Sequence, residues 1–178
     1  PLTRKDCLGG GLMGWFDFEG KINGSCGMTP VFEPNVAETS DGRLLLFARS
    51  TVGRLVSSYS YDHGSTWYAV RPTELASGQS PPVLIRIPQT GDLLCVWNQV
   101  SGQEVADGMA QSRMSLAVSE DDGKTWSGYR EIARINENVR AVSYPFLTQT
   151  KGGDSFFCLT AGEKIHVPIE WLKRKHVV

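Results

Sequence analysis

The sequence predicts an all-β protein built from β-propeller blades, of which about two and a half to three are present. Short segments with alternating apolar residues recur between turns that contain glycine. The same strand plan begins near residues 34, 82 and 144, and an octad of the form S-x-D-x-G-x-T-W occurs twice, 59 residues apart. Repeats of roughly this length are typical of propeller blades, here lengthened by one long loop.

The first copy of the plan starts with two strands that pair across a short turn. Residues 34–39 and 43–48 are the expected strands, and Ser-Asp-Gly at residues 40–42 is a typical hairpin turn. Residues 54–60 add a third strand with alternating side chains. The first octad, residues 60–67, closes this unit, which therefore supplies most of one blade.

Two further copies follow along the chain. The second has expected strands at residues 82–87, 92–97 and 113–118, with a polar loop over residues 99–111. The third copy is partial. Its expected elements are strands at residues 144–148, 154–159 and 164–167 and a short amphipathic helical turn at residues 168–175.

The N-terminal part of the chain does not share this plan. It is rich in glycine and has no sustained period, and its run LGGGLMG lacks the ending of a phosphate-binding loop. The expected division is an irregular or edge-covering segment at residues 1–28 and a partial propeller at residues 29–178, with blades at about 29–72, 73–135 and 136–178.

The composition gives no reason to expect nucleic acid or membrane as a partner. A net charge of −1 and a pI near 6.4 provide no basic surface for phosphate groups. No apolar run approaches the ~20 residues needed to span a bilayer, and the first residues lack the apolar region of a signal peptide. The compartment stays open, because a leader can be removed from a mature chain.

The cysteines do not predict a metal site. Cys7, Cys26, Cys95 and Cys158 show no C-x-x-C spacing, and no other feature calls for a cofactor. Cys95 and Cys158 lie in apolar strand segments and are expected to be buried thiols. A Cys7–Cys26 disulfide is compatible with the sequence but has no independent support.

The octad has a physical explanation as a turn. An aspartate carboxylate accepts backbone N–H groups, glycine adopts positive φ, and tryptophan packs back over the hairpin. Asp62 and Asp121 are therefore expected to shape the turns and not to bind metal. His63, inside the first octad, is expected to be an exposed structural position.

The octad resembles the Asp-box of the sialidase (neuraminidase) family, and the stretch from about residue 32 to residue 172 resembles the C-terminal half of that family. The resemblance implies a six-bladed propeller with its site on the axis. It also implies an exo-α-sialidase-like glycoside hydrolase that releases terminal sialic acid, with a sialylated or related acidic glycan as partner and a secreted or periplasmic location. Asp-boxes lie on the outer rim of several propellers, so they mark the fold and not the chemistry.

Four residues resemble functional positions of that family. Glu33 before Pro34 resembles a catalytic glutamate, and Tyr144 resembles the tyrosine nucleophile. Arg49 and Arg113 resemble the second and third arginines of a triad that binds the substrate carboxylate. The chemistry is coherent, because arginine binds carboxylates bidentately and a neutral phenol is not repelled by them. A phenol also needs a nearby base, which Glu33 would supply.

Repeat positions add weaker candidates. Arg54 and Arg113 both stand six residues before an octad, and Arg49 and Asn98 both stand seven after a turn glycine. Arg54 and Asn98 are therefore further candidates for substrate binding. Ser80 occupies the position analogous to Glu33 and Tyr144 and is a candidate for a minor wall contact.

Two family parts have no counterpart in this sequence: the first triad arginine and the aspartate that acts as general acid and base. Arg86, in an Arg-Ile-Pro motif, imitates that arginine, but it immediately precedes a hairpin turn and is expected at the outer end of its strand. The site would need N-terminal blades or a second copy in a homodimer, and the isolated chain is expected to be inactive.

Two other functions remain open at the level of the sequence. The first is a non-catalytic Asp-box propeller that binds glycan or protein. The second is a related propeller hydrolase that acts on another sugar acid. The octads do not separate these functions from a sialidase, because they mark only the fold.

Overall fold

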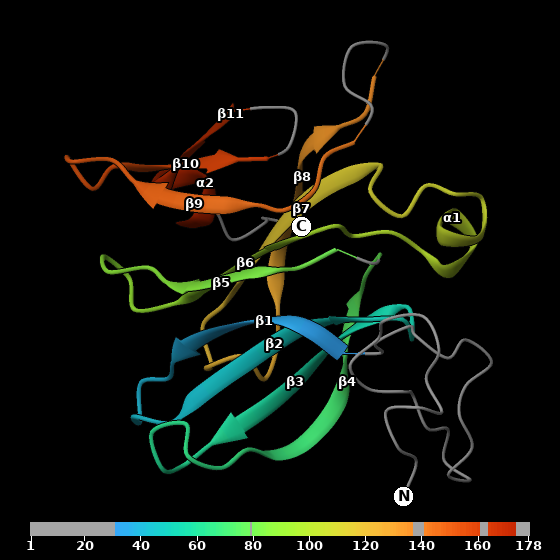
Figure 1. Cartoon of the computed structure of the whole chain (residues 1–178). Helices are drawn as coiled ribbons and strands as arrows, with labels where there is room; N and C mark the ends of the chain where they lie inside the picture. Colours follow the sequence, from blue (N-terminus) through green and yellow to red (C-terminus); the bar gives the residue numbers. More distant parts are fainter. Residues whose placement is uncertain (1–30, 79, 137–140, 161–163, 174–178) are drawn as a thin grey trace, which may run out of the picture.

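The computed structural model describes residues 31–78, 80–136, 141–160 and 164–173, and within them the chain is all-β, with three antiparallel sheets. Figure 1 shows the sheets in sequence order, with the second lying between the first and the third. The all-β prediction and the partial propeller are confirmed. The predicted edge-covering segment at residues 1–28 and the cysteines Cys7 and Cys26 lie outside the described residues.

The first sheet has four strands in the order of the sequence. They are β1 (Val31–Glu38), β2 (Leu44–Ser50), β3 (Arg54–Ser60) and β4 (Tyr68–Ala76). The first three match the predicted strands, and β4 follows the octad. The repeat alignment covered three strands, whereas this sheet also pairs β3 with the strand after the turn, and residue 72 lies within that strand. The blade boundaries at about residues 72 and 135 stay predictions.

The second and third sheets continue the pattern. The second contains β5 (Val83–Arg86), β6 (Leu93–Trp97), β7 (Arg113–Ser119) and β8 (Ser127–Arg134), and the third contains β9 (Phe146–Gln149), β10 (Ser155–Leu159) and β11 (Lys164–Pro168). The helical turn expected at the end is α2 (Ile169–Lys173). The polar loop between β6 and β7 contains a helix that was not predicted, α1 (Gly102–Ala106). No described helix is long and apolar enough to cross a membrane.

The strand β6 explains how the sheets are held together. Its residues are buried on both faces, and alternate side chains enter two different cores. Leu93, Cys95 and Trp97 pack against the first sheet. Leu94 and Val96 pack against the third sheet. The second sheet is thus covered on both sides, which is why its central strand reads as a continuous apolar run.

Both octads form the predicted turn with nearly identical bonds. In the first, Asp62 Oδ1 accepts from the backbone N–H of Thr66 at 2.8 Å, and Ser60 Oγ accepts from Gly64 N at 2.8 Å. The second octad repeats both bonds through its own Asp, Thr, Ser and Gly, each at 2.8 Å. The interpretation of Asp62 as a turn-forming residue is confirmed.

The second octad also joins two sheets. The carboxylate of Asp122 accepts from the backbone N–H of Ser40 at 2.9 Å, and the hydroxyl of Ser40 also donates to this carboxylate. Arg86 Nη2 contacts Asp122 Oδ1 at 2.7 Å. Arg86 also donates from Nε to the carbonyl of Glu38 at 2.8 Å and from Nη1 to the carbonyl of Gly91. Arg86 is therefore a structural link between the first and second sheets, as its place before the hairpin predicted.

Candidate active site

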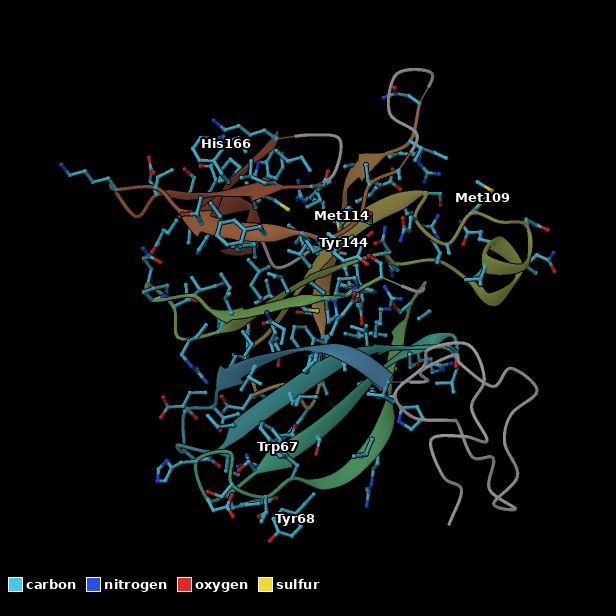
Figure 2. The ribbon with its side chains drawn as sticks, in the orientation of Figure 1. Trp67, Tyr68, Met109, Met114, Tyr144 and His166 are labelled. Carbon is cyan, nitrogen blue, oxygen red and sulfur yellow. The ribbon has the colours of Figure 1, made fainter. Side chains whose placement is uncertain are left out.

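Three predicted site residues meet although they are far apart in the sequence. The hydroxyl of Tyr144 donates to Glu33 Oε1 at 3.2 Å and accepts from Arg49 Nη1 at 3.3 Å. The same Nη1 lies 2.8 Å from Glu33 Oε2. Phenol, carboxylate and guanidinium thus form a closed triangle that joins the first sheet to the segment before β9. Figure 2 shows Tyr144 near the middle of the molecule.

Glu33 and Tyr144 share the same unusual backbone conformation. Both have φ of 55°, which is uncommon for residues other than glycine. Each precedes a proline, Pro34 or Pro145, and a residue before proline avoids the right-handed helical region. Strained backbone of this kind clusters at functional sites. The two residues occupy equivalent positions at the starts of their blades, as the repeat alignment predicted.

The cluster is open on the side of the phenol. Tyr144 is 53% exposed, whereas the side chain of Arg49 is 15% exposed and that of Glu33 is 34% exposed. Arg49 is at the end of β2, and β1 bulges between residues 32 and 35, beside Glu33. The arrangement offers an accessible hydroxyl whose proton a carboxylate can accept, beside a fixed positive charge.

Arg113 lies at the start of β7 but is held by the loop from β6. Its Nη2 contacts Glu104 Oε2 at 2.9 Å, and its Nε donates to the carbonyl of Gln99. Both side chains of the ion pair are 24% exposed. The structure does not show a bond between Arg113 and the cluster of Glu33, Arg49 and Tyr144.

Asn98 connects the backbone of two site segments. Its side chain is fully buried, and its amide nitrogen donates to the carbonyl of Arg113 at 2.7 Å and to that of Val142 at 2.6 Å. It therefore fixes the start of β7 next to the segment that carries Tyr144. Its prediction as a substrate-binding residue gains no support from this buried position, which favours a positioning role.

The other weak candidates lie in different surroundings. Arg54 donates from Nη1 to the carbonyls of Thr73 at 3.3 Å and Glu74 at 3.0 Å, so its guanidinium is bound to β4. Ser80 is fully buried, and its hydroxyl has no hydrogen-bond partner among the described residues. Neither position adds a ligand contact to the cluster.

No group of histidine, cysteine and carboxylate side chains that could hold a metal ion occurs within the described part of the chain. Cys95 and Cys158 are buried free thiols, as predicted. Burial raises the pKa of Cys158 to about 12, so this thiol is not a nucleophile at neutral pH.

Glu104 was not predicted as a site residue from the sequence. A signal for it was present, because Ser101-x-x-Glu104 has the form of a capping box that starts a helix. The structure contains that box: Ser101 Oγ accepts from Glu104 N at 3.2 Å, and Glu104 Oε2 accepts from Ser101 N at 2.7 Å. The contact with Arg113 depends on how the loop folds back, which the local pattern does not reveal.

The repeated antiparallel sheets and the two Asp-boxes are those of an Asp-box β-propeller. The family described as the BNR repeat-like domain matches residues 18–157, which is more than half of the chain. The chain belongs to this family. No curated protein matches the chain.

Solved structures with the same fold include both sialidases and arabinan-degrading enzymes. A NanB sialidase variant from Streptococcus pneumoniae has a TM-score of 0.62 and 17% identity over 79% of this chain and 24% of its own. The intramolecular trans-sialidase from Ruminococcus gnavus has a TM-score of 0.58 and 19% identity, covering 80% and 34%. The α-L-arabinanase from Penicillium chrysogenum has a TM-score of 0.52 and 21% identity, covering 72% and 40%. The chain thus spans 40% or less of each of these three proteins.

Proposed function

We propose that this chain is part of an exo-α-sialidase-like glycoside hydrolase, with Tyr144 as nucleophile and Glu33 as its base. The observation that carries the proposal is the hydrogen bond between the exposed hydroxyl of Tyr144 and the carboxylate of Glu33, at 3.2 Å. A nucleophile within hydrogen-bond reach of a base, itself oriented by a third group, is the general signature of covalent catalysis. Arg49 is that third group.

The reaction would proceed in two displacements. The oxygen of Tyr144 forms a bond to the anomeric carbon while its proton passes to Glu33 and the bond to the leaving oxygen breaks. An acid that we do not assign among these residues protonates the leaving group. Water then attacks the anomeric carbon and gives a proton to the conjugate base of that acid, while the bond to the tyrosine oxygen breaks and the proton held by Glu33 returns to the phenol oxygen. Tyrosine nucleophiles of this kind are the known exception to the two-carboxylate pattern of glycosidases.

Arg49 and Arg113 would give the site a preference for a sugar that carries a carboxylate. Arg49 places its guanidinium beside the phenol, and Arg113 lies at the start of β7 in the neighbouring second sheet. A planar guanidinium matches a carboxylate better than an ammonium does. A terminal sialic acid carries its carboxylate on the reacting carbon, so a positive site next to the nucleophile fits it.

A second candidate is hydrolysis of a neutral sugar on the same framework. The fold is also that of the arabinanase described above, and in this structure Arg49 and Arg113 each contact a carboxylate of the chain itself. A substrate panel separates the two candidates. It should contain a fluorogenic α-sialoside and a fluorogenic α-L-arabinofuranoside, and we expect turnover of the sialoside only.

Replacing Tyr144 with phenylalanine tests the nucleophile. In a protein that includes the remaining blades, we expect Tyr144→Phe to lower kcat for the sialoside by about a thousandfold or more, because loss of one member of a catalytic unit removes most of its effect. Tyr61→Phe is the control, since Tyr61 occupies a variable position of the first Asp-box and is 64% exposed. Binding of sialoside without any turnover in the wild type would contradict the proposal and favour a non-catalytic glycan-binding propeller.

The 178 residues alone are expected to be inactive, because the first triad arginine and the general acid are not identified among them. Further blades or a second copy of the chain would complete the site. Light scattering on the purified chain distinguishes a monomer from a dimer. Appreciable sialoside hydrolysis by a monomer of this chain would show that the expectation of inactivity is wrong.

A further inference from the structure

The carboxylate of Glu104 already occupies one of the two edges through which the guanidinium of Arg113 can bind a ligand carboxylate. Bidentate binding of a carboxylate takes two neighbouring N–H groups of the guanidinium. In Arg113, Nη2 contacts Glu104 Oε2 at 2.9 Å and Nε donates to the carbonyl of Gln99. The edge formed by these two nitrogens is therefore filled by groups of the chain itself.

Glu104 is held in place by the helix it belongs to. Its Oε2, which contacts Arg113, also accepts from the backbone N–H of Ser101 at 2.7 Å. The hydrogen bonds from Ser101 and the nearby charge of Arg113 lower the pKa of Glu104, so the side chain is anionic at neutral pH. One oxygen thus both caps α1 and binds Arg113, and α1 has no buried residues. Displacing α1 would therefore uncover no buried side chain of the helix.

A second arginine, Arg134, lies next to Arg113 in the second sheet. Arg134 of β8 lies opposite Arg113 in the strand register, and like charges in that position repel each other. Arg134 is itself paired with Glu131, at 2.5 Å. Glu104 is the carboxylate bound to Arg113, so its removal leaves a net gain of positive potential at the start of β7.

We propose that Glu104 is an internal competitor for Arg113 and thereby determines how strongly the site prefers a sugar that carries a carboxylate. An acidic ligand reaches the Nη2 edge of Arg113 only by displacing Glu104. A neutral ligand has no such competition. The inference rests on the proposed function, because it assumes that a sugar binds at the site that includes Arg113.

The test compares an acid with its neutral ester. The probes are the α-methyl glycoside of N-acetylneuraminic acid and the methyl ester of its carboxylate. The measured quantity is the ratio of their dissociation constants, from ligand-observed NMR titration of a protein that includes the remaining blades. Glu104→Gln is the variant of choice, because glutamine still completes a capping box but carries no charge. In Glu104→Gln we expect the preference for the acid, given by the ratio of the dissociation constants of ester and acid, to be about two- to fivefold larger than in the wild type. This is the range that partly exposed ion pairs support.

A matched control removes a different carboxylate–arginine pair. Asp41 contacts Arg43 at 2.8 Å in the hairpin between β1 and β2. Asp41→Asn changes the net charge by the same amount, and the ratio should stay at its wild-type value. An additional Arg113→Ala variant should lose the preference for the acid.

The possible results separate the two levels of the proposal. If the wild type binds the acid and Glu104→Gln leaves the ratio unchanged, the role of Glu104 is overturned while the proposed site stands. A change of the same size in Asp41→Asn overturns it too, because the effect would then be one of net charge. If neither probe binds to the wild type, the proposed function is overturned and the role of Glu104 with it.

Discussion

Positive φ at residues other than glycine marks the informative positions of this chain. Among the described residues these are Glu33, Tyr144, His63 and Asp122. The first two belong to the candidate site, and the other two hold the same position in the two Asp-boxes. The repeat therefore places the same unusual backbone conformation at equivalent positions, and the side chain present at each position determines what that position does. His63 is exposed, whereas Asp122 joins two sheets.

The carboxylate of Asp62 predicts a dependence of stability on pH. Hydrogen bonds from Thr66 hold the pKa of Asp62 below its ordinary value of 3.8. A lowered folded-state pKa means that the stabilisation is present above the unfolded-state pKa and is lost as pH falls through the folded-state pKa. We expect Asp62→Asn to lower Tm at pH 7, and the difference from the wild type to shrink below pH 3.8.

Thermal unfolding followed by circular dichroism between pH 7 and pH 2 measures this effect. Glu120→Gln, at an exposed variable position of the second Asp-box, is the control and should follow the wild type at every pH. An Asp62→Asn difference that grows on acidification would contradict the assignment of Asp62 as an ionised acceptor in the turn.

At the scale of elements, the two Asp-boxes have the same internal hydrogen bonds but pack differently against the rest of the chain. A Cβ added to Gly123 would lie 2.3 Å from Leu45 Cδ2, a residue of the neighbouring sheet. A Cβ added to the corresponding Gly64 would meet only ordinary contacts, at 3.5 Å from Leu44 and 3.8 Å from Trp67. The second box is packed between two blades, and the first box contacts its own blade.

This difference predicts unequal costs for the same substitution. Both glycines have positive φ, 84° for Gly123 and 89° for Gly64, so alanine brings backbone strain of about 1 kcal/mol at either site. Gly123→Ala should cost about 1–3 kcal/mol more than Gly64→Ala, because it overpacks the contact with Leu45. Urea unfolding measures both, and equal losses would contradict the close packing of the second box.

At the scale of the whole molecule, the blades are joined by apolar cores and by polar contacts, of which the link through Asp122 is one. Phe47 of the first sheet packs on Trp126 of the second box, with ring centroids 5.5 Å apart. Nearby, Asp122 binds both Ser40 and Arg86. The face of the first sheet that points away from the second carries exposed apolar side chains, including Val70 at 64% exposure, and Figure 2 shows Trp67 and Tyr68 on that side.

Removing the charge of Asp122 tests the polar link. We expect Asp122→Asn to destabilise the chain by about 1 kcal/mol, because asparagine tolerates the positive φ but leaves Arg86 without its anionic partner. Asp41→Asn breaks an ion pair within a single hairpin, where the aspartate is 54% exposed, and should destabilise the chain less than Asp122→Asn does. Urea unfolding of the two variants compares these losses, and a larger loss for Asp41→Asn would contradict the role of Asp122.

The sequence by itself determined the fold class, the Asp-box turns and the three residues that meet at the site. It could do so because turns and strands are set by local patterns, and because a repeat places equivalent residues at equivalent ends of blades. The choice of Glu33, Arg49 and Tyr144 came from their resemblance to sialidase motifs, and the repeat supported it by giving Glu33 and Tyr144 equivalent places. The place of Arg86 at the outer end of its strand followed from the hairpin turn beside it.

Only the tertiary structure decided what Arg113, Asn98 and Glu104 contact. Arg113 and Asn98 have strand-end positions that suggested a ligand, yet the loop from β6 folds back and brings Glu104 to Arg113, and burial turns Asn98 towards two backbone carbonyls. The physical reason is that ion pairs and buried amides take partners from distant parts of the chain. Which partner is nearest depends on the packing of whole blades and not on the spacing of residues within one.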